Sequence, residues 1–179
     1  MAVLLDEAST PPVRTVLTRL LASADEADFA VSRVRLAAID LDSAEAASIG
    51  RCRFLLGRLE AEGLSELNAG NGTGHLMALH TLLLSGRIEI RSAGMLAWVP
   101  DFSVFRGVRS PTSPATVAVL GAHYFRDAPV PDGPSLTCII AERQGVEVLS
   151  RRFQSLWDAA HDVQAAVLHT IERNLTVRR

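Results

Sequence analysis

Short apolar segments of two kinds alternate along this chain, and their order constrains the fold more than any other feature. Some segments have the two-residue period of a strand, whereas others repeat their apolar residues every three or four positions, as a helix does. This order predicts an α/β domain with a mixed β-sheet flanked by helices. Helices are predicted over 10–24, 42–63, 73–85 and 145–175, and strands over 28–41, 88–90, 95–107 (two short strands hinged at Pro100), 115–125 and 135–141.

Two of the predicted helices depend on particular residues. The helix over 42–63 starts at Asp42, which forms a capping-box pattern with Glu45. Its apolar residues have helical spacing: Ile49, Cys52, Leu55, Leu56 and Leu59. The helix over 145–175 is predicted to be unbroken because seven residues share one face: Phe153, Leu156, Trp157, Ala160, Gln164, Val167 and Ile171.

The length and composition indicate one folded domain. The chain has 179 residues, of which 48% are apolar and 21% charged, and this argues against disorder as the dominant state. We divide it into an N-terminal helical segment (1–27), an α/β domain (28–173) and a C-terminal tail (174–179). The first ten residues have no basic leader, and no apolar run reaches the ~20 residues of a membrane span. We therefore expect a protein of the reducing bacterial cytoplasm, with no signal peptide and no membrane contact.

The chain contains no lysine, since all 18 basic residues are arginine. A GC-rich coding bias is the ordinary cause, but the consequence is chemical: Schiff-base, P-loop and lysine-acid chemistry are all excluded. The net charge of −2 argues mildly against binding nucleic acid through bulk charge and leaves nucleic-acid binding open. Cys52 and Cys138 are too few for a disulfide framework or a cysteine zinc cage, and we interpret both as packing residues.

Several motifs suggest ligand sites, and for each a structural role is favoured. The segment "NAGNGTGH" (68–75) precedes a helix, but it lacks the dinucleotide-fingerprint spacing and the P-loop lysine, so we interpret it as a turn. His161 lies between Asp158 and Asp162 at a spacing that can bring three metal ligands together, yet this polar face is typical of a solvated helix surface. His75 and His80 lie about 140° apart around a helix and cannot chelate one ion together. We expect no metal and no cofactor.

His123 is the remaining candidate for catalysis. It follows the apolar run of "AVLGAHYF" (118–125), at a strand end where sites gather in α/β sheets. Asp101 on a neighbouring strand would orient it for acid–base chemistry. Packing at the rim of the sheet is the favoured alternative for His123 and Tyr124. The four serines considered as nucleophiles lie outside any Gly-x-Ser-x-Gly elbow: Ser103, Ser110, Ser113 and Ser135.

The second half of the chain resembles one half-domain of the phospholipase D (HKD) superfamily. The segments "LHTLLLSGRIEIRSAG", "TVAVLGAHYF" and "VEVLSRRFQSLWDAAHDV" follow one another in the order of that family. The closing helix carries a Phe-x-x-x-Trp pattern at Phe153 and Trp157. The similarity extends more faintly back to residue 28, so the α/β domain over 28–173 is identified as phospholipase D-like.

The resemblance implies where the family's catalytic motifs would stand. The His-x-Lys positions fall on Val99 and Asp101, and the Gly-Ser-x-Asn positions begin at Gly121 and Ala122 and place Tyr124 where the asparagine would be. In the family a histidine attacks phosphorus while lysine and asparagine neutralise the phosphate oxygens. Valine cannot attack phosphorus, and aspartate repels phosphate. The resemblance therefore implies that the catalytic motif is lost.

We interpret the chain as a catalytically inactive phospholipase D-like protein that acts as a binding, sensing or assembly module. Active family members pair two half-domains about a pseudo-twofold axis, so a homodimer is expected. Residues assigned to a ligand, anion or interface site are Arg91, Val99, Asp101, Arg106, Gly121, His123, Tyr124 and Arg126.

Two alternatives stay open. One is a phosphodiesterase-type hydrolase with an altered site, in which His123 and Asp101 are catalytic and Arg91, Arg106 or Arg126 binds the anionic substrate. The other is an inactive subunit in a hetero-complex with an active nuclease.

Overall fold

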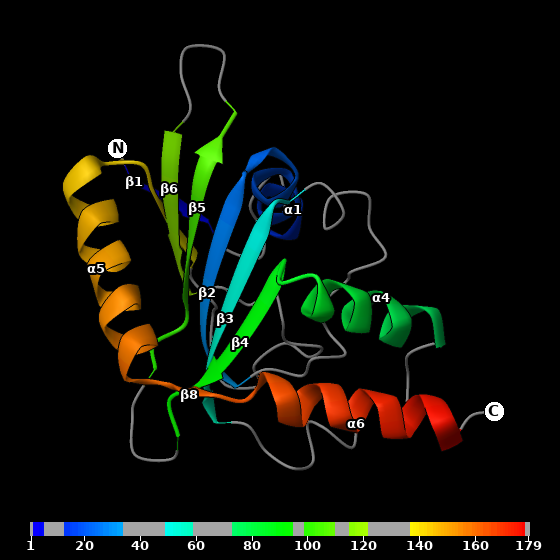
Figure 1. The fold of residues 1–179 in the computed structure, drawn as a ribbon. Helices are drawn as coiled ribbons and strands as arrows, with labels where there is room; N and C mark the ends of the chain where they lie inside the picture. Colours follow the sequence, from blue (N-terminus) through cyan, green and yellow to red (C-terminus); the bar gives the residue numbers. More distant parts are fainter. Residues whose placement is uncertain are drawn as a thin grey trace, which may run out of the picture.

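A computed structural model of the protein describes residues 2–5, 13–33, 49–58, 73–94, 99–109, 115–121 and 137–177. These residues form one mixed sheet with helices on both faces, which confirms the α/β class predicted from the sequence (Figure 1). The strands are β1 (Ala2–Leu5), β2 (Glu26–Arg33), β3 (Arg51–Arg58), β4 (Ile88–Ser92), β5 (Phe102–Val108), β6 (Ala115–Leu120), β7 (Thr137–Ile140) and β8 (His161–Asp162). The helices are α1 (Val13–Ser23), α4 (Thr73–Leu84), α5 (Arg143–Ala159) and α6 (Gln164–Val177).

The strand order in the sheet is β1-β7-β6-β5-β2-β3-β4-β8. Strands β2, β3 and β4 are parallel to one another, whereas the other pairs are antiparallel. Because β5 is antiparallel to β2, it begins at the edge where the three parallel strands end, and β6 ends at that same edge. We call this side of the sheet the carboxyl edge, and Asp101 and Gly121, two of the positions that the sequence analysis assigned to a site, lie there.

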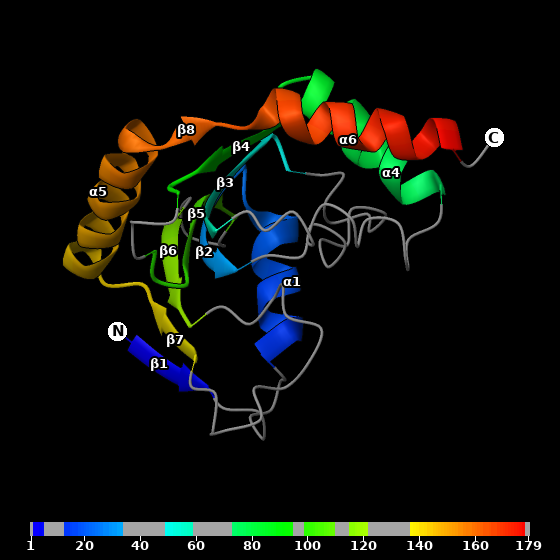
Figure 2. The same cartoon turned by 90° about the horizontal axis from the view of Figure 1, so that it is seen from below.

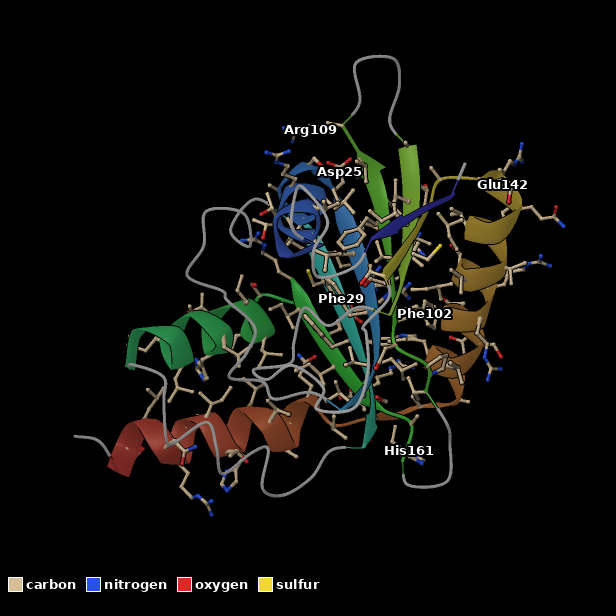
Figure 3. All side chains as sticks on the ribbon, turned by 180° about the vertical axis from the view of Figure 1, so that it is seen from behind. Asp25, Phe29, Phe102, Arg109, Glu142 and His161 are labelled. Atoms are coloured by element: carbon tan, nitrogen blue, oxygen red, sulfur yellow. The ribbon has the colours of Figure 1, made fainter. Side chains whose placement is uncertain are left out.

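Helices lie on both faces of the sheet (Figure 2), and an apolar core lies on each face. Helices α1, α4 and α6 cover one face, with Leu17, Leu79 and Ile171 among their buried residues. Helix α5 covers the other face with Phe153 and Trp157, and the ring of Phe153 meets that of Phe102 edge to face at 6.4 Å. Figure 3 shows the two sides through Phe29, which lies on the side of α1, and Phe102, which lies toward α5.

Strand β3 corrects the helix predicted over 42–63, because residues 51–58 are extended and pair with β2 and β4. Phe54 and Leu56 belong to the core under α1, α4 and α6, whereas Leu55 belongs to the core under α5. A parallel strand buried on both faces has a nearly continuous apolar run, so its sequence lacks strand alternation. Cys52, Leu55 and Leu56 are by chance spaced as they would be on one face of a helix, and the sequence pattern therefore predicted a helix. Asp42 and Glu45 lie outside the described residues.

The helix predicted over 145–175 is also wrong as one element. Helix α5 ends at Ala159, strand β8 pairs with β4, and the Asp162 carboxylate then accepts a hydrogen bond from the Gln164 N–H (2.8 Å) at the start of α6. The chain thus passes around the edge of the sheet. The apolar residues of the predicted stripe divide between two faces, with Trp157 under α5 and Val167 under α6.

The remaining elements follow the predictions where the structure describes them, with one addition. The predicted helices over 10–24 and 73–85 correspond to α1 and α4, and the strands predicted over 88–90, 115–125 and 135–141 correspond to β4, β6 and β7. Strand β5 is the second half of the predicted 95–107 pair, and residues 95–98 are outside the described part. The addition is β1, which pairs with β7 antiparallel. None of the helices in the described ranges is long and apolar enough to cross a membrane.

Two neighbouring leucines at the end of α4 test this packing. Leu83 is 1% exposed and Leu84 is 64% exposed. We expect Leu83→Ala to lower the free energy of unfolding by about 2–5 kcal/mol because it leaves a cavity in the core. Leu84→Ala is the matched control, and it should change this free energy by less than about 0.5 kcal/mol. Urea unfolding followed by circular dichroism measures both, and equal losses would contradict this placement of α4.

Candidate functional site

The start of β5 and the end of β6 are joined at the carboxyl edge. Phe102 pairs with Leu120, and the next N–H along β6, that of Gly121, donates to the carbonyl oxygen of Asp101 (2.9 Å). Gly121 has φ = 76°, a left-handed conformation that glycine adopts without strain. The structure therefore brings two of the predicted site positions, Asp101 and Gly121, into direct contact.

The Asp101 carboxylate is engaged with the neighbouring strand. Its Oδ1 accepts a hydrogen bond from the backbone N–H of Ser32, which lies near the end of β2, at 2.6 Å. A carboxylate that accepts from a backbone N–H forms a charge-assisted hydrogen bond, which is stronger than a neutral one. Asp101 thus fastens the β5–β6 hairpin to the end of β2.

Val99 is a core residue. It is 1% exposed and belongs to the apolar cluster that contains Leu55, Phe102 and Trp157. Gly57 at the end of β3 permits this close packing, since a Cβ there would lie 3.3 Å from the Val99 Cβ and 2.9 Å from the Ser32 carbonyl oxygen. The position that the resemblance assigns to the attacking histidine is therefore occupied by a buried aliphatic side chain.

The two described arginines of the predicted site lie apart from each other. Arg91 on β4 stacks its guanidinium over the Trp157 ring (4.8 Å to the centroid) and donates to the Trp157 carbonyl oxygen (2.9 Å). It pairs with Leu55 in register and so lies toward the carboxyl edge. Arg106 pairs with Glu26 at the opposite end of β5. Arg106 is thus not brought together with Asp101. His123, Tyr124, Arg126 and Ala122 lie outside the described residues.

A buried ion cluster, which the sequence analysis missed, holds the opposite end of the sheet. Asp28 on β2 is 1% exposed, and its carboxylate accepts from Arg53 Nε (2.7 Å) and Nη2 (2.8 Å) and from Arg106 Nη1 (2.5 Å). Partial burial acts to lower the pKa of Arg53, but the hydrogen bonds and charge of Asp28 outweigh it, so this pKa lies above its usual value. The sequence signal for this cluster is weak, because β2 and β3 each carry other charged residues and nothing local distinguishes Asp28 and Arg53 from them.

Arg53 also connects this cluster to α5. Its guanidinium lies over the Phe153 ring (4.9 Å) and the Trp157 ring (5.2 Å), and its Nη1 donates to the Gln154 side-chain oxygen (3.1 Å). Planar stacking and bidentate pairing are geometries that arginine provides and lysine does not. The Phe-x-x-x-Trp pattern noted in the sequence therefore forms a platform for arginines of β3 and β4.

The two cysteines differ in burial, and Cys52 is the buried one. Burial, with a smaller contribution from the charge of Asp28, raises the pKa of Cys52 to about 12 against the opposing effect of Arg87. The thiol therefore stays neutral at physiological pH and packs in the core, as the sequence analysis interpreted it. Cys138 is half-buried on β7.

The candidate metal ligands near the C-terminus serve other roles. Asp158 accepts from the Gln154 amide (2.7 Å), Asp162 caps α6, and His161 pairs with Ser92 in register across β8 and β4. Within the described ranges no three His, Cys, Asp or Glu side chains gather closely enough to hold an ion. The Nε2 of His80 lies 3.3 Å from the Oε1 of Glu172 on α6. The side chain of His75 is outside the described part.

The contribution of the buried Asp28 cluster to stability can be compared with that of an exposed ion pair. Asp28→Asn leaves Arg53 partly buried without its counter-charge, so we expect the free energy of unfolding to fall by about 3–5 kcal/mol. Glu147→Gln is the matched control, because Glu147 pairs with Arg143 on the exposed surface of α5 and its loss should have no measurable effect. Chemical denaturation of both variants decides this, and indistinguishable midpoints would contradict the assigned role of Asp28.

Comparisons with known proteins place this fold. No family model matches the sequence, and no curated protein matches it. Among solved structures, it is similar to polyphosphate kinase from Porphyromonas gingivalis (TM-score 0.58, 16% identity, 87% of this chain and 26% of the kinase). It is also similar to TrmBL2, an archaeal chromatin protein whose structure shows a novel mode of DNA binding (TM-score 0.54, 14% identity, 90% of this chain and 54% of TrmBL2).

A third similar structure is the phospholipase D family member Nuc from Salmonella typhimurium (TM-score 0.56, 14% identity). The match covers 90% of this chain and 98% of Nuc, whereas the chain spans only about half of TrmBL2 and a quarter of the kinase. At these identities the likeness shows the fold alone. The chain is therefore an α/β domain with a phospholipase D-like fold.

Proposed function

We propose that this chain is a non-catalytic protein of the phospholipase D-like fold that acts as a binding, sensing or assembly module. The observation that carries the proposal is the burial of Val99, which fills the position of the attacking histidine and is 1% exposed. An aliphatic side chain packed between β3 and α5 has no lone pair to offer phosphorus.

The residue two positions later also opposes phosphate binding. Asp101 stands where the family has a lysine, and its charge would repel a phosphate oxygen 4 Å away by roughly 4 kcal/mol at an effective dielectric of about 20. Its hydrogen bond to the Ser32 N–H (2.6 Å) holds the carboxylate at this edge. The lack of lysine anywhere in the chain leaves arginine as the only side-chain cation that is permanently charged.

The alternative is a hydrolase that uses His123 and Asp101. Within this alternative, Arg106 is an unsuitable substrate ligand, because it lies at the far end of β5 and is paired with Asp28. Arg91 lies toward the carboxyl edge, but its guanidinium is already occupied by Trp157. The geometry of the described residues thus favours the non-catalytic function.

We expect the purified chain to release no 4-nitrophenol from bis(4-nitrophenyl) phosphate above the buffer rate. The reason is that neither a nucleophile at position 99 nor a cation at position 101 is present. Absorbance at 405 nm measures the release, and the His123→Ala variant is the matched control. Turnover that disappears in His123→Ala, with an unchanged circular dichroism spectrum, would replace this proposal with the hydrolase.

We also propose a homodimer, formed through the surface around Asp101, His123 and Tyr124, with Val99 (1% exposed) buried beneath it. The match to Nuc covers 98% of that phospholipase D family member, which supports comparing this chain with one half-domain. Pairing of two such units about a twofold axis would cover the carboxyl edge of each sheet.

Light scattering should therefore give a mass of 38.6 kDa, twice the 19.3 kDa chain. His123→Asp should shift the mass toward the monomer, because it adds one carboxylate from each protomer to the proposed interface. His169→Asp, at an exposed position of α6, is the control and should keep the dimer. A monomeric wild-type chain would contradict the homodimer, and a second protein captured in equal amount from the native host would favour the hetero-complex.

A further inference from the structure

A narrow gap separates α1 from the sheet, on the face opposite to Val99. The residues that line it are Leu17 and Leu21 of α1, Phe29 of β2, and Ser103 and Phe105 of β5. Four of the five are apolar, and none is charged. The gap is too narrow in this state to admit a water molecule.

Ser103 is the exception in this apolar lining. It is 1% exposed, and its Oγ has no hydrogen-bond partner among the described residues. A buried hydroxyl without a partner destabilises a fold, and such groups are rare in native proteins. Since no water fits beside it, the hydroxyl stays unsatisfied while α1 rests on the sheet. An alanine would fill the same position without this cost.

The two walls of the gap are formed by different kinds of side chain. On the sheet side, the Phe29 ring stacks on Phe54 (4.9 Å) and meets Phe105 edge to face (5.7 Å), so this wall is a fixed aromatic surface. On the helix side, the side chains of α1 that are buried are Leu17 and Leu21 among those described. The end of α1 is tied where the Arg109 N–H donates to the Ser23 carbonyl oxygen (2.9 Å; Arg109 is labelled in Figure 3).

We propose that this gap is a binding site for a small, neutral, largely aromatic molecule with one hydrogen-bonding group. The ligand enters when α1 moves away from the sheet about its tied end, and its polar group pairs with the Ser103 hydroxyl. The aromatic wall of Phe29 and Phe105 favours a flat ring. A charged ligand is excluded, because no lining side chain would compensate its loss of hydration. This site is independent of the proposed function, since it lies on the other face of the sheet.

Indole and indene test the proposal as matched probes, because they share one bicyclic shape and only indole carries an N–H. Titration of the full-length chain is followed through the methyl NMR signals of Leu17 and Leu21. Both probes should shift these signals, and indole should bind roughly three- to tenfold more tightly, as one neutral hydrogen bond allows. Unmoved leucine methyls with either probe, or equal affinities, would overturn the proposal.

Ser103→Ala separates the hydrogen bond from simple filling of the gap. This variant should bind indene as the wild type does and lose the preference for indole. Ser103→Cys, which keeps the shape but offers only a weak hydrogen-bonding group, provides a second variant and should lose most of the preference. A preference for indole that survives in both variants would show that Ser103 is not the partner.

Discussion

Burial of β3 on both faces is the constraint on which the rest of the structure depends. Leu55 and Leu56 are each 0% exposed and point into different cores, so this strand can lie only in the middle of the sheet. Its parallel pairing with β2 and β4 then sends three carboxyl ends to one edge. At that edge Gly57 lets β3 approach Ser32 and Val99 closely, and the aliphatic side chain of Val99 fills the remaining space. The burial of Val99 is thus part of the same core that surrounds β3.

The buried and half-buried charges hold the sheet together and connect it to α5. Asp28 is held by Arg53 and Arg106 at one end of the sheet, and Arg53 and Arg91 reach Phe153 and Trp157 of α5. A buried carboxylate is tolerated only with compensating charge and hydrogen bonds, and two guanidinium groups supply both. These three arginines are therefore bound to protein groups.

The sequence predicted the fold class because most elements, such as α4 and β4, lie where the spacing of apolar residues predicts a helix or a strand. It failed at β3, where burial on both faces removes alternation, and at the last helix, where neither glycine nor proline marks the break before β8. The sequence analysis assigned Asp101 and Gly121 to one site, but it did not predict the hydrogen bond between them. The pairing of Asp28 with Arg53, 25 residues apart, depends on strand register, which no local pattern specifies. The roles of His123 and Tyr124 stay predictions.

Strand β5 links the two proposals through the alternation of its side chains. Phe102 and Val104 point toward α5, and Ser103 and Phe105 point toward α1, so one strand faces both cores. On the α5 side Val99 is packed in the core with Phe102 and Val104. On the α1 side the buried Ser103 hydroxyl lacks a hydrogen-bond partner among the described residues. Within the described part of the chain, the unsatisfied Ser103 hydroxyl faces α1, so the proposed ligand site lies under this helix and away from the carboxyl edge.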